Sequence, residues 1–148
     1  MLRKVMLAVG MFALLSGCAT RHSFDQAKEH SEATKNRITE TLVEVARSEL
    51  PAETRRQRNE ALAKVLDRVH DVDRLLIEAM FEKMAPSRAE AIERALVLSY
   101  DAWGNVARFA AVSVEFDPEA DVDAVSAQAE AHFRELASEL ESARRSIR

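Results

Sequence analysis

The chain has 148 residues, of which 47% are hydrophobic, 31% are charged and only 5% are aromatic. This composition is that of one domain able to bury an apolar core, and it excludes a disordered acidic tail. The formal net charge of −4 argues against a nucleic-acid binder, and the single cysteine excludes an internal disulfide and a cysteine-based zinc site. With 3 glycines and 3 prolines, the chain has too few turn-forming residues for a β-sandwich or β-barrel.

The N-terminal residues have the pattern of a secretion signal. Arg3 and Lys4 precede an uncharged apolar run from Val5 to Leu15. A helix of that length spans about 16 Å, roughly half the hydrocarbon core of a bilayer, so the run is too short for a transmembrane anchor. Its length is instead that of the apolar region of a signal peptide.

The residues that end this run, Leu15-Ser16-Gly17-Cys18, resemble the lipobox of bacterial lipoproteins. The resemblance implies that residues 1–17 are a cleaved signal peptide. Cys18 then becomes the first residue and carries an S-diacylglycerol and an N-acyl (palmitate-type) lipid. Because Ala19 rather than aspartate follows the cysteine, the resemblance also implies a cell-envelope protein held at the outer membrane and facing the periplasm. The rest of the chain resembles no recognised family.

The mature chain is predicted to form long helices separated by prolines. Pro51, Pro86 and Pro118 divide it into four segments of similar length. Proline ends a preceding helix and favours the first turn of the next one, and Ser87 and Glu90 have the spacing of a capping box. We therefore predict an all-α fold, an antiparallel helical bundle of three to four long helices.

The first segment changes character along its length. It is polar up to about Lys35, and apolar residues at helical spacing begin only at Ile38. The sequence therefore predicts that the chain has three parts. They are the signal peptide 1–17, a lipid-anchored polar stalk or start of the first helix at 18–35, and the helical domain at 36–148.

The second and fourth segments carry apolar stripes at spacings of three and four residues, the pattern of amphipathic helices. The stripe of the second segment consists of Leu62, Val65, Leu66, Val69, Val72, Leu76, Met80 and Met84. The stripe of the fourth consists of Val122, Val125, Ala129, His132, Phe133, Leu136, Leu140, Ala143 and Ile147.

The third segment is the most apolar. Between Arg94 and Glu115 its only charged residues are Asp101 and Arg108. A helix of this kind is either enclosed by other helices or covers a partner. We expect a central core helix and keep a partner-binding face as the alternative.

Trp103, Phe109 and Val112 are the candidate residues of that partner-binding face. The same stretch carries a further ambiguity, because residues 112–116 alternate between apolar and polar side chains. This alternation is also compatible with an extended end of the segment.

A basic cluster begins the second segment. Arg55, Arg56 and Arg58 lie where a helix dipole disfavours cations. They are candidates for contact with an anionic group, such as a lipid head group, lipopolysaccharide or an acidic partner surface. The alternative is a solvated face in which Glu53 and Glu60 offset the positive charge.

No catalytic, metal or cofactor site is predicted. Asp67 and His70 give one imperfect copy of the Glu-x-x-His motif, of which a di-iron bundle needs two. Neither a nucleophile elbow nor a phosphate-binding glycine loop is present in the sequence. We therefore expect no enzymatic activity, and no cofactor other than the lipid on Cys18.

The sequence thus indicates a non-catalytic binding or scaffolding module for another envelope component, held to its membrane by lipid. The expected partner is an envelope protein or a second copy in a coiled coil, and not a nucleic acid. A covalent link to peptidoglycan is not expected, because the chain ends in Arg148 rather than lysine. The alternative function is a carrier that holds a small hydrophobic ligand in the bundle. Its candidate residues are Met80, Phe81, Met84, Trp103 and Phe109.

Overall fold

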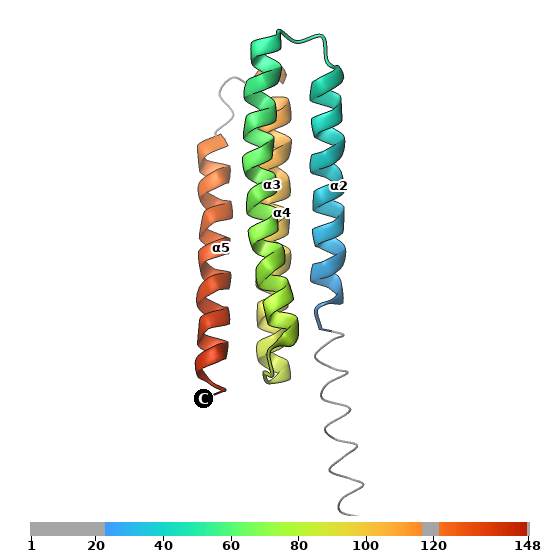
Figure 1. Ribbon diagram of the computed structural model, residues 1–148. Helices are drawn as coiled ribbons and strands as arrows, with labels where there is room; N and C mark the ends of the chain where they lie inside the picture. Colours follow the sequence, from blue (N-terminus) through green and yellow to red (C-terminus); the bar gives the residue numbers. More distant parts are fainter. Residues whose placement is uncertain (1–22, 117–121, 148) are drawn as a thin grey trace, which may run out of the picture.

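The computed structural model describes residues 23–116 and 122–147, with side chains for all of these except 112–116 and 122. The described residues form four helices and no strand, which confirms the predicted all-α bundle (Figure 1). The helices are α2 (Asp25–Arg47), α3 (Ala52–Phe81), α4 (Pro86–Phe116) and α5 (Val122–Arg145). Successive helices run in opposite directions, so the topology is up-and-down (Figure 1).

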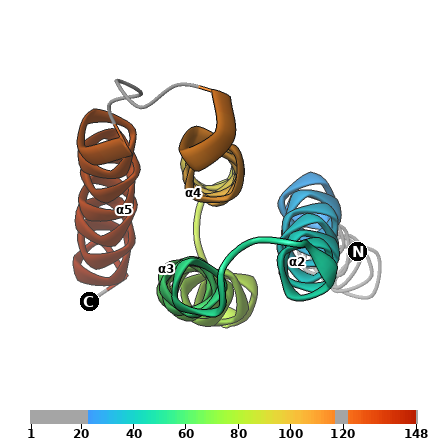
Figure 2. The ribbon, with the colours of Figure 1, turned by 90° about the horizontal axis from the view of Figure 1, so that it is seen from above.

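Helix α4 is the central element of the bundle. Seen along the bundle axis, it has α2 on one side and α5 on the other, with α3 below (Figure 2). It packs against all three, whereas α3 and α5 touch only sparsely. Ile92, Leu96 and Tyr100 of α4 are fully buried. The predicted role of this segment as a core helix is thereby confirmed.

The predicted apolar stripes account for most of what α3 and α5 contribute to the core. In α3 the buried side chains include Leu62, Val69 and Val72, and in α5 they include Leu136 and Leu140. These residues belong to stripes that repeat every three or four residues, so one side of each helix is buried while the other side remains exposed to solvent. At the end of α3, Met80 and Phe81 are exposed, and so is Ile147, which follows α5.

Prolines mark two of the helix boundaries. Pro51 is the N-cap residue of α3 and makes no side-chain cap hydrogen bond, as expected from its sequence. Pro86 is the first residue of α4, the position at which a missing amide hydrogen costs least. The predicted capping box starting at Ser87 is wrong, because Ser87 already lies inside the helix and Ala85 accepts the first backbone hydrogen bonds. Pro118 lies outside the described residues.

The polar beginning of the first segment is helical. Helix α2 starts at Asp25, and its residues Ala27, Ser31 and Thr34 are buried against the bundle. Small and hydroxyl-bearing side chains produce this packing without an apolar stripe. Because that stripe is missing, the sequence alone also allows a stalk over residues 18–35. From Asp25 onward the segment is the start of the helix rather than a projection from it.

Two other predictions concern the ends of described segments. Helix α4 continues to Phe116, so residues 112–116 are helical and the extended alternative is wrong. The signal peptide and Cys18 lie outside the described residues. None of the four described helices combines the length and the apolar character that crossing a bilayer requires.

The up-and-down topology brings three chain segments to the same end of the bundle. The start of α2, the turn between α3 and α4, and the end of α5 all lie at one end (Figure 1). The turn between α2 and α3 lies at the opposite end (Figure 1). The two ends are separated by about 45 Å, the length of the 30-residue helix α3 at 1.5 Å per residue.

Candidate binding cleft between α3, α4 and α5

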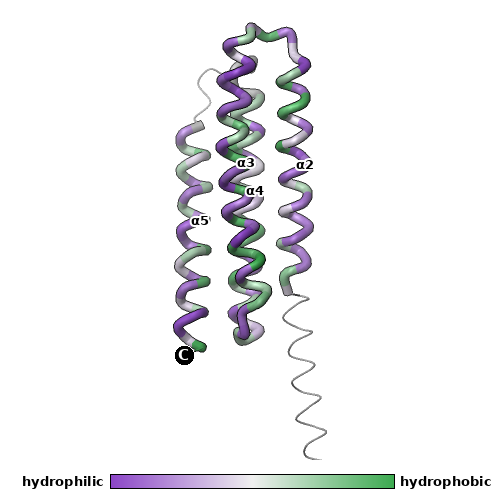
Figure 3. The backbone as a smooth tube through the Cα atoms, in the orientation of Figure 1, coloured by the Kyte–Doolittle hydropathy of each residue, from purple (hydrophilic) through white to green (hydrophobic). Residues whose placement is uncertain are grey.

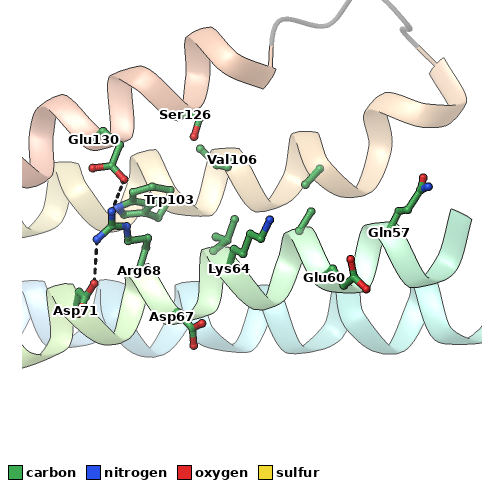
Figure 4. A pocket seen from close by; sticks show the side chains of 13 residues that line it. Gln57, Glu60, Lys64, Asp67, Arg68, Asp71, Trp103, Val106, Ser126 and Glu130 are labelled. Atoms are coloured by element: carbon green, nitrogen blue, oxygen red, sulfur yellow. Dashed lines mark hydrogen bonds and ion pairs between the residues drawn. The ribbon is translucent and has the colours of Figure 1, made fainter. Parts of the chain in front are cut away.

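An open cleft of about 630 Å³ lies between α3, α4 and α5 (Figure 4). Its volume is within the range of protein sites that hold small molecules or a few side chains of a partner. The lining residues come from all three helices and are Gln57, Glu60, Ala61, Lys64, Val65, Asp67, Arg68, Asp71, Trp103, Val106, Ala110, Ser126 and Glu130.

The cleft exists because α5 packs on α4 and is joined to α3 mainly through charged side chains. Arg144 of α5 binds Glu78 and Glu82 of α3, with nitrogen–oxygen distances of 2.5 and 3.1 Å. Nearer the middle of the bundle, Arg68 of α3 binds Glu130 of α5 at 3.0 Å. Long side chains that meet across a gap hold two helices together without requiring their backbones to approach.

Apolar side chains form the inner wall of the cleft. Val65 of α3 and Trp103 and Val106 of α4 are each at most 5% exposed. The indole nitrogen of Trp103 is buried and has no hydrogen-bond partner in the described part of the chain. A buried donor left without an acceptor costs about 1–3 kcal/mol, so a bound group that supplies an acceptor there would recover that energy.

Charged side chains surround this apolar wall, and carboxylates are in the majority. Four acidic and two basic residues line the cleft, namely Glu60, Asp67, Asp71 and Glu130 against Lys64 and Arg68. The cleft is therefore a poor site for an anion. Its charge favours a neutral or cationic occupant.

Arg68 lies toward one end of this rim. Its guanidinium lies between Asp71, at 3.1 Å, and Glu130, at 3.0 Å (Figure 4). The same guanidinium lies over the ring of Phe133, 5.5 Å from the ring centre, in a cation–π contact. Arg68 thus connects α3 with α5 and closes the cleft on one side.

The residues of the predicted partner-binding face do not lie on one surface. Trp103 is buried in the wall of the cleft, whereas 39% of Phe109 is exposed elsewhere on α4. Six residues of helix separate the two side chains by about 120° around the axis, which explains the divergence. The side chain of Val112 lies outside the described ones. Of the two described side chains, Trp103 is a residue of the cleft and Phe109 is not.

The three arginines predicted to contact an anion also diverge. Arg55 donates a hydrogen bond to the carbonyl oxygen of Ala46 at 3.3 Å. Arg56 pairs with Glu53 at 2.6 Å and with Glu60 at 3.3 Å, as the solvated-face alternative anticipated. The hydrogen bond from Arg56 lowers the pKa of Glu53 and, reciprocally, raises the pKa of Arg56.

Arg58 points into the bundle and is only 5% exposed. Its Nη1 atom donates to the carbonyl oxygen of Ala111 at 3.2 Å. Its Nε and Nη2 atoms have no hydrogen-bond partner among the described residues. The three arginines therefore do not form a common anion-binding surface, because one is turned inward and another is already paired.

A partly buried polar cluster joins α2, α3 and α4, and sequence reasoning missed it. The carboxylate of Asp73 accepts hydrogen bonds from the hydroxyl of Ser31, from Lys35 at 2.8 Å and from the hydroxyl of Tyr100 at 2.7 Å. Thr34 donates to the carbonyl oxygen of Tyr100 at 3.4 Å. The one sequence feature that could have indicated this cluster is the position of Asp73, a charged residue that directly follows Val72 of the apolar stripe of α3.

The cluster shifts the pKa of both of its acids. Burial acts to raise the pKa of Asp73, but hydrogen bonds from Lys35, Ser31 and Tyr100 outweigh burial and lower it below its ordinary value. Burial and the hydrogen bond to Asp73 raise the pKa of Tyr100 well above its ordinary value. Asp73 is therefore a charged acceptor and Tyr100 a neutral donor at physiological pH. This arrangement holds three helices in register rather than moving a proton.

Histidines and carboxylates do not gather into a metal site within the described residues. His30 lies 3.1 Å from Asp101, and His132 lies 3.9 Å from Glu135. No group of three potential metal ligands occurs in the described part of the chain. These histidines are each placed beside one carboxylate at the surface or its boundary.

Comparisons of the chain with models of protein families, with curated proteins and with solved structures found no match. What the chain does is therefore inferred from its sequence and from the cleft.

Proposed function

We propose that the protein is a lipid-anchored component of the bacterial cell envelope whose non-catalytic helical domain binds another envelope component in the α3–α4–α5 cleft. Leu15-Ser16-Gly17-Cys18 is the basis for the anchor. The single observation that carries the binding role is the open cleft with the unpaired indole donor of Trp103 in its wall.

The position of the cleft suits a protein that is tethered at its N-terminus. Gln57 is close to the start of α3, and Ser126 is close to the start of α5. Both of these helix starts lie toward the end of the bundle opposite the start of α2 (Figure 1). A chain anchored at residue 18 therefore has its cleft on the side away from the anchor, where a partner can approach.

The lining defines the chemistry of the occupant. Val65, Trp103 and Val106 offer a surface for one or two apolar side chains, and the indole N–H of Trp103 calls for a carbonyl or hydroxyl acceptor. The acidic rim favours a lysine or arginine beside those apolar groups. A segment of an envelope protein with apolar and basic side chains satisfies all three requirements.

The anchor is tested by the mass of the mature protein. When the full-length gene is expressed in a bacterium with a lipoprotein pathway, we expect a protein that starts at Cys18 and carries lipid on that residue. Cys18→Ser should leave the precursor uncleaved and free of lipid. An unmodified wild-type protein cleaved elsewhere would contradict the proposed anchor.

The cleft is tested by cross-linking in living cells. A photoreactive amino acid placed at Gln57, which lines the cleft, should give a discrete covalent adduct with one partner. The matched control is the same substitution at Gln128, which is exposed on α5 and is not among the lining residues. Equal adducts from both positions, or none from Gln57, would contradict a binding role for the cleft.

Trp103 offers an independent measurement because it is the only tryptophan of the chain. Its fluorescence reports on the wall of the cleft without a label. Once the cross-linked partner is identified, its binding should shift or quench this emission. Binding without any change in Trp103 emission would place the partner elsewhere on the bundle.

The size of the cleft also supports a second candidate function, a carrier of a small hydrophobic ligand. Of the five residues that the sequence suggested for such a ligand, Trp103 alone lines the cleft, and Met80, Phe81 and Phe109 are exposed. Native mass spectrometry of the lipidated protein distinguishes the two functions. A carrier retains a non-covalent ligand of defined mass, whereas a protein-binding module does not.

A further inference from the structure

A group of exposed apolar side chains occurs at one end of the bundle. In α3, 80% of Phe81, 55% of Ile77 and 37% of Met80 are exposed, and 47% of Ile147 is exposed just after α5. We call these four residues the apolar end patch. Figure 3 shows hydrophobic colour at the end of α3 and at the tip of the chain beyond α5.

The four residues belong to neighbouring parts of the structure. Arg144, three residues before Ile147, binds Glu82, which directly follows Phe81. The end of α5 is thereby held beside the end of α3. Isolated exposed apolar residues need no explanation, but an exposed phenylalanine grouped with isoleucine and methionine is typical of a surface that contacts a protein or a membrane.

The apolar end patch lies at the end of the bundle where α2 begins (Figure 1). Phe24, which immediately precedes α2, follows Cys18 by six positions. Six extended residues span at most about 22 Å. A lipid on Cys18 therefore keeps the start of α2, and with it this end of the bundle, close to the membrane, whereas it sets no such limit on the opposite end.

We propose that the apolar end patch rests in the interface of the lipid bilayer to which Cys18 is anchored. The inference rests on the proposed lipid anchor and adds to it a second contact that sets the orientation of the domain. The occupant of the patch is a lipid surface, because the short tether brings the patch to a membrane before any other partner arrives.

The composition of this end fits an interfacial contact. Phe81 and Met80 offer apolar surface at the tip of α3, and the exposed Lys83 lies two residues after Phe81 with its positive charge. Aromatic and apolar side chains enter the boundary between head groups and acyl chains, while long basic side chains reach back to the phosphates. Because the anchor raises the local concentration of lipid, a contact too weak to hold a free protein is sufficient here.

This contact would orient the bundle with its long axis roughly perpendicular to the membrane surface. The apolar end patch would face the lipid, and the opposite end, with the starts of α3 and α5, would extend about 45 Å into the periplasm, as the 30-residue α3 requires. The α3–α4–α5 cleft would then be held open to the periplasm rather than pressed against lipid.

The experiment uses the lipidated full-length protein in vesicles of phosphatidylethanolamine and phosphatidylglycerol. Cys18 is the only cysteine of the chain, so once it carries lipid an introduced cysteine is the only free thiol. Phe81→Cys and, separately, Ile77→Cys are labelled with an environment-sensitive fluorophore. The matched control is Val43→Cys, an exposed apolar position (42% exposed) near the opposite end of α2. Some of the vesicle lipid carries a nitroxide quencher just below the head group.

We expect the probes at Phe81 and Ile77 to lose most of their fluorescence to the nitroxide lipid, and the probe at Val43 to lose little. Equal quenching at all three positions, in a protein whose lipid is confirmed by mass, would overturn the membrane contact and leave the anchor intact. A protein without lipid at Cys18 would overturn both proposals. Shielding of the Phe81 probe that rises with protein concentration, without quenching by nitroxide lipid, would assign the patch to a second copy and overturn the proposal.

Discussion

The two sides of α4 are built on different principles. On one side, α2 and α3 are joined by the partly buried cluster around Asp73, in which a charged acceptor meets three donors. On the other side, α3 and α5 are joined by ion pairs of Arg68 and Arg144 that remain partly exposed, with an open cleft between the two helices. We call the contact between α2 and α3 the closed seam, because polar groups meet there directly. We call the contact between α3 and α5 the open seam, because ion pairs span a gap there.

The difference bears on where binding can occur. A partly buried carboxylate that accepts from three donors tolerates little rearrangement, because any separation of the helices leaves charged and polar groups unpaired. Exposed ion pairs contribute little stability and exchange readily with water. The seam between α3 and α5 is therefore the part of the bundle that can widen to admit a partner at low cost.

The largest expected effect comes from removing the centre of the closed seam. Asp73→Ala takes away the acceptor of three hydrogen bonds and leaves the buried hydroxyls of Tyr100 and Ser31 unpaired. We expect the free energy of unfolding, measured with urea, to fall by about 3 kcal/mol. The matched control is Asp67→Ala, at an exposed position of the same helix, for which we expect a change within about 0.5 kcal/mol. Similar losses for the two variants would show that the cluster is not a stabilising joint.

The same carboxylate predicts how stability depends on pH. Because the pKa of Asp73 is lower in the folded protein than in the unfolded chain, the unfolded chain binds the proton more tightly in acid. The contribution of Asp73 is thus fully present above the ordinary aspartate pKa of about 3.9 and is lost as the pH falls through the folded pKa. Urea unfolding between pH 5 and pH 3 should show a smaller loss of stability for Asp73→Asn than for the wild type. An unchanged slope in Asp73→Asn would contradict this assignment.

The sequence predicted the fold because each helix carries its own signal. Pro86 opens α4 and Pro51 caps α3, and the stripe that contains Leu62 and Val69 identifies the inner side of α3. These signals are local, since a helix needs only a boundary and one apolar side. Four such segments joined by short turns leave few alternatives to an antiparallel bundle.

The cleft could not be predicted, because it depends on how far apart two helices stand. The spacing of Leu136 and Leu140 shows that α5 has an inner side, but it does not say whether α3 or α4 receives it. The partners of Asp73 were equally inaccessible, because Ser31 and Tyr100 lie 42 and 27 positions away in the chain. Trp103 is a candidate partner-binding residue from the sequence alone, but the sequence does not show that its neighbours in the wall of the cleft include Val65 of another helix.

The smallest effect on stability is expected in the open seam between α3 and α5, and it should be confined to the end of α5. Arg144→Ala removes two ion pairs that join the end of α5 to α3, and the loss of overall stability should be small because the side chains are partly exposed. The expected result is faster amide hydrogen exchange in the second half of α5 with unchanged exchange in α2, because the loss frees one helix and does not disturb the Asp73 cluster. Arg145→Ala is the matched control, since Arg145 pairs with Glu141 of its own helix at 3.1 Å and does not bridge to α3. Faster exchange in α2 and α5 together would mean that the bundle unfolds as one unit and that the two seams do not differ in the way their contacts suggest.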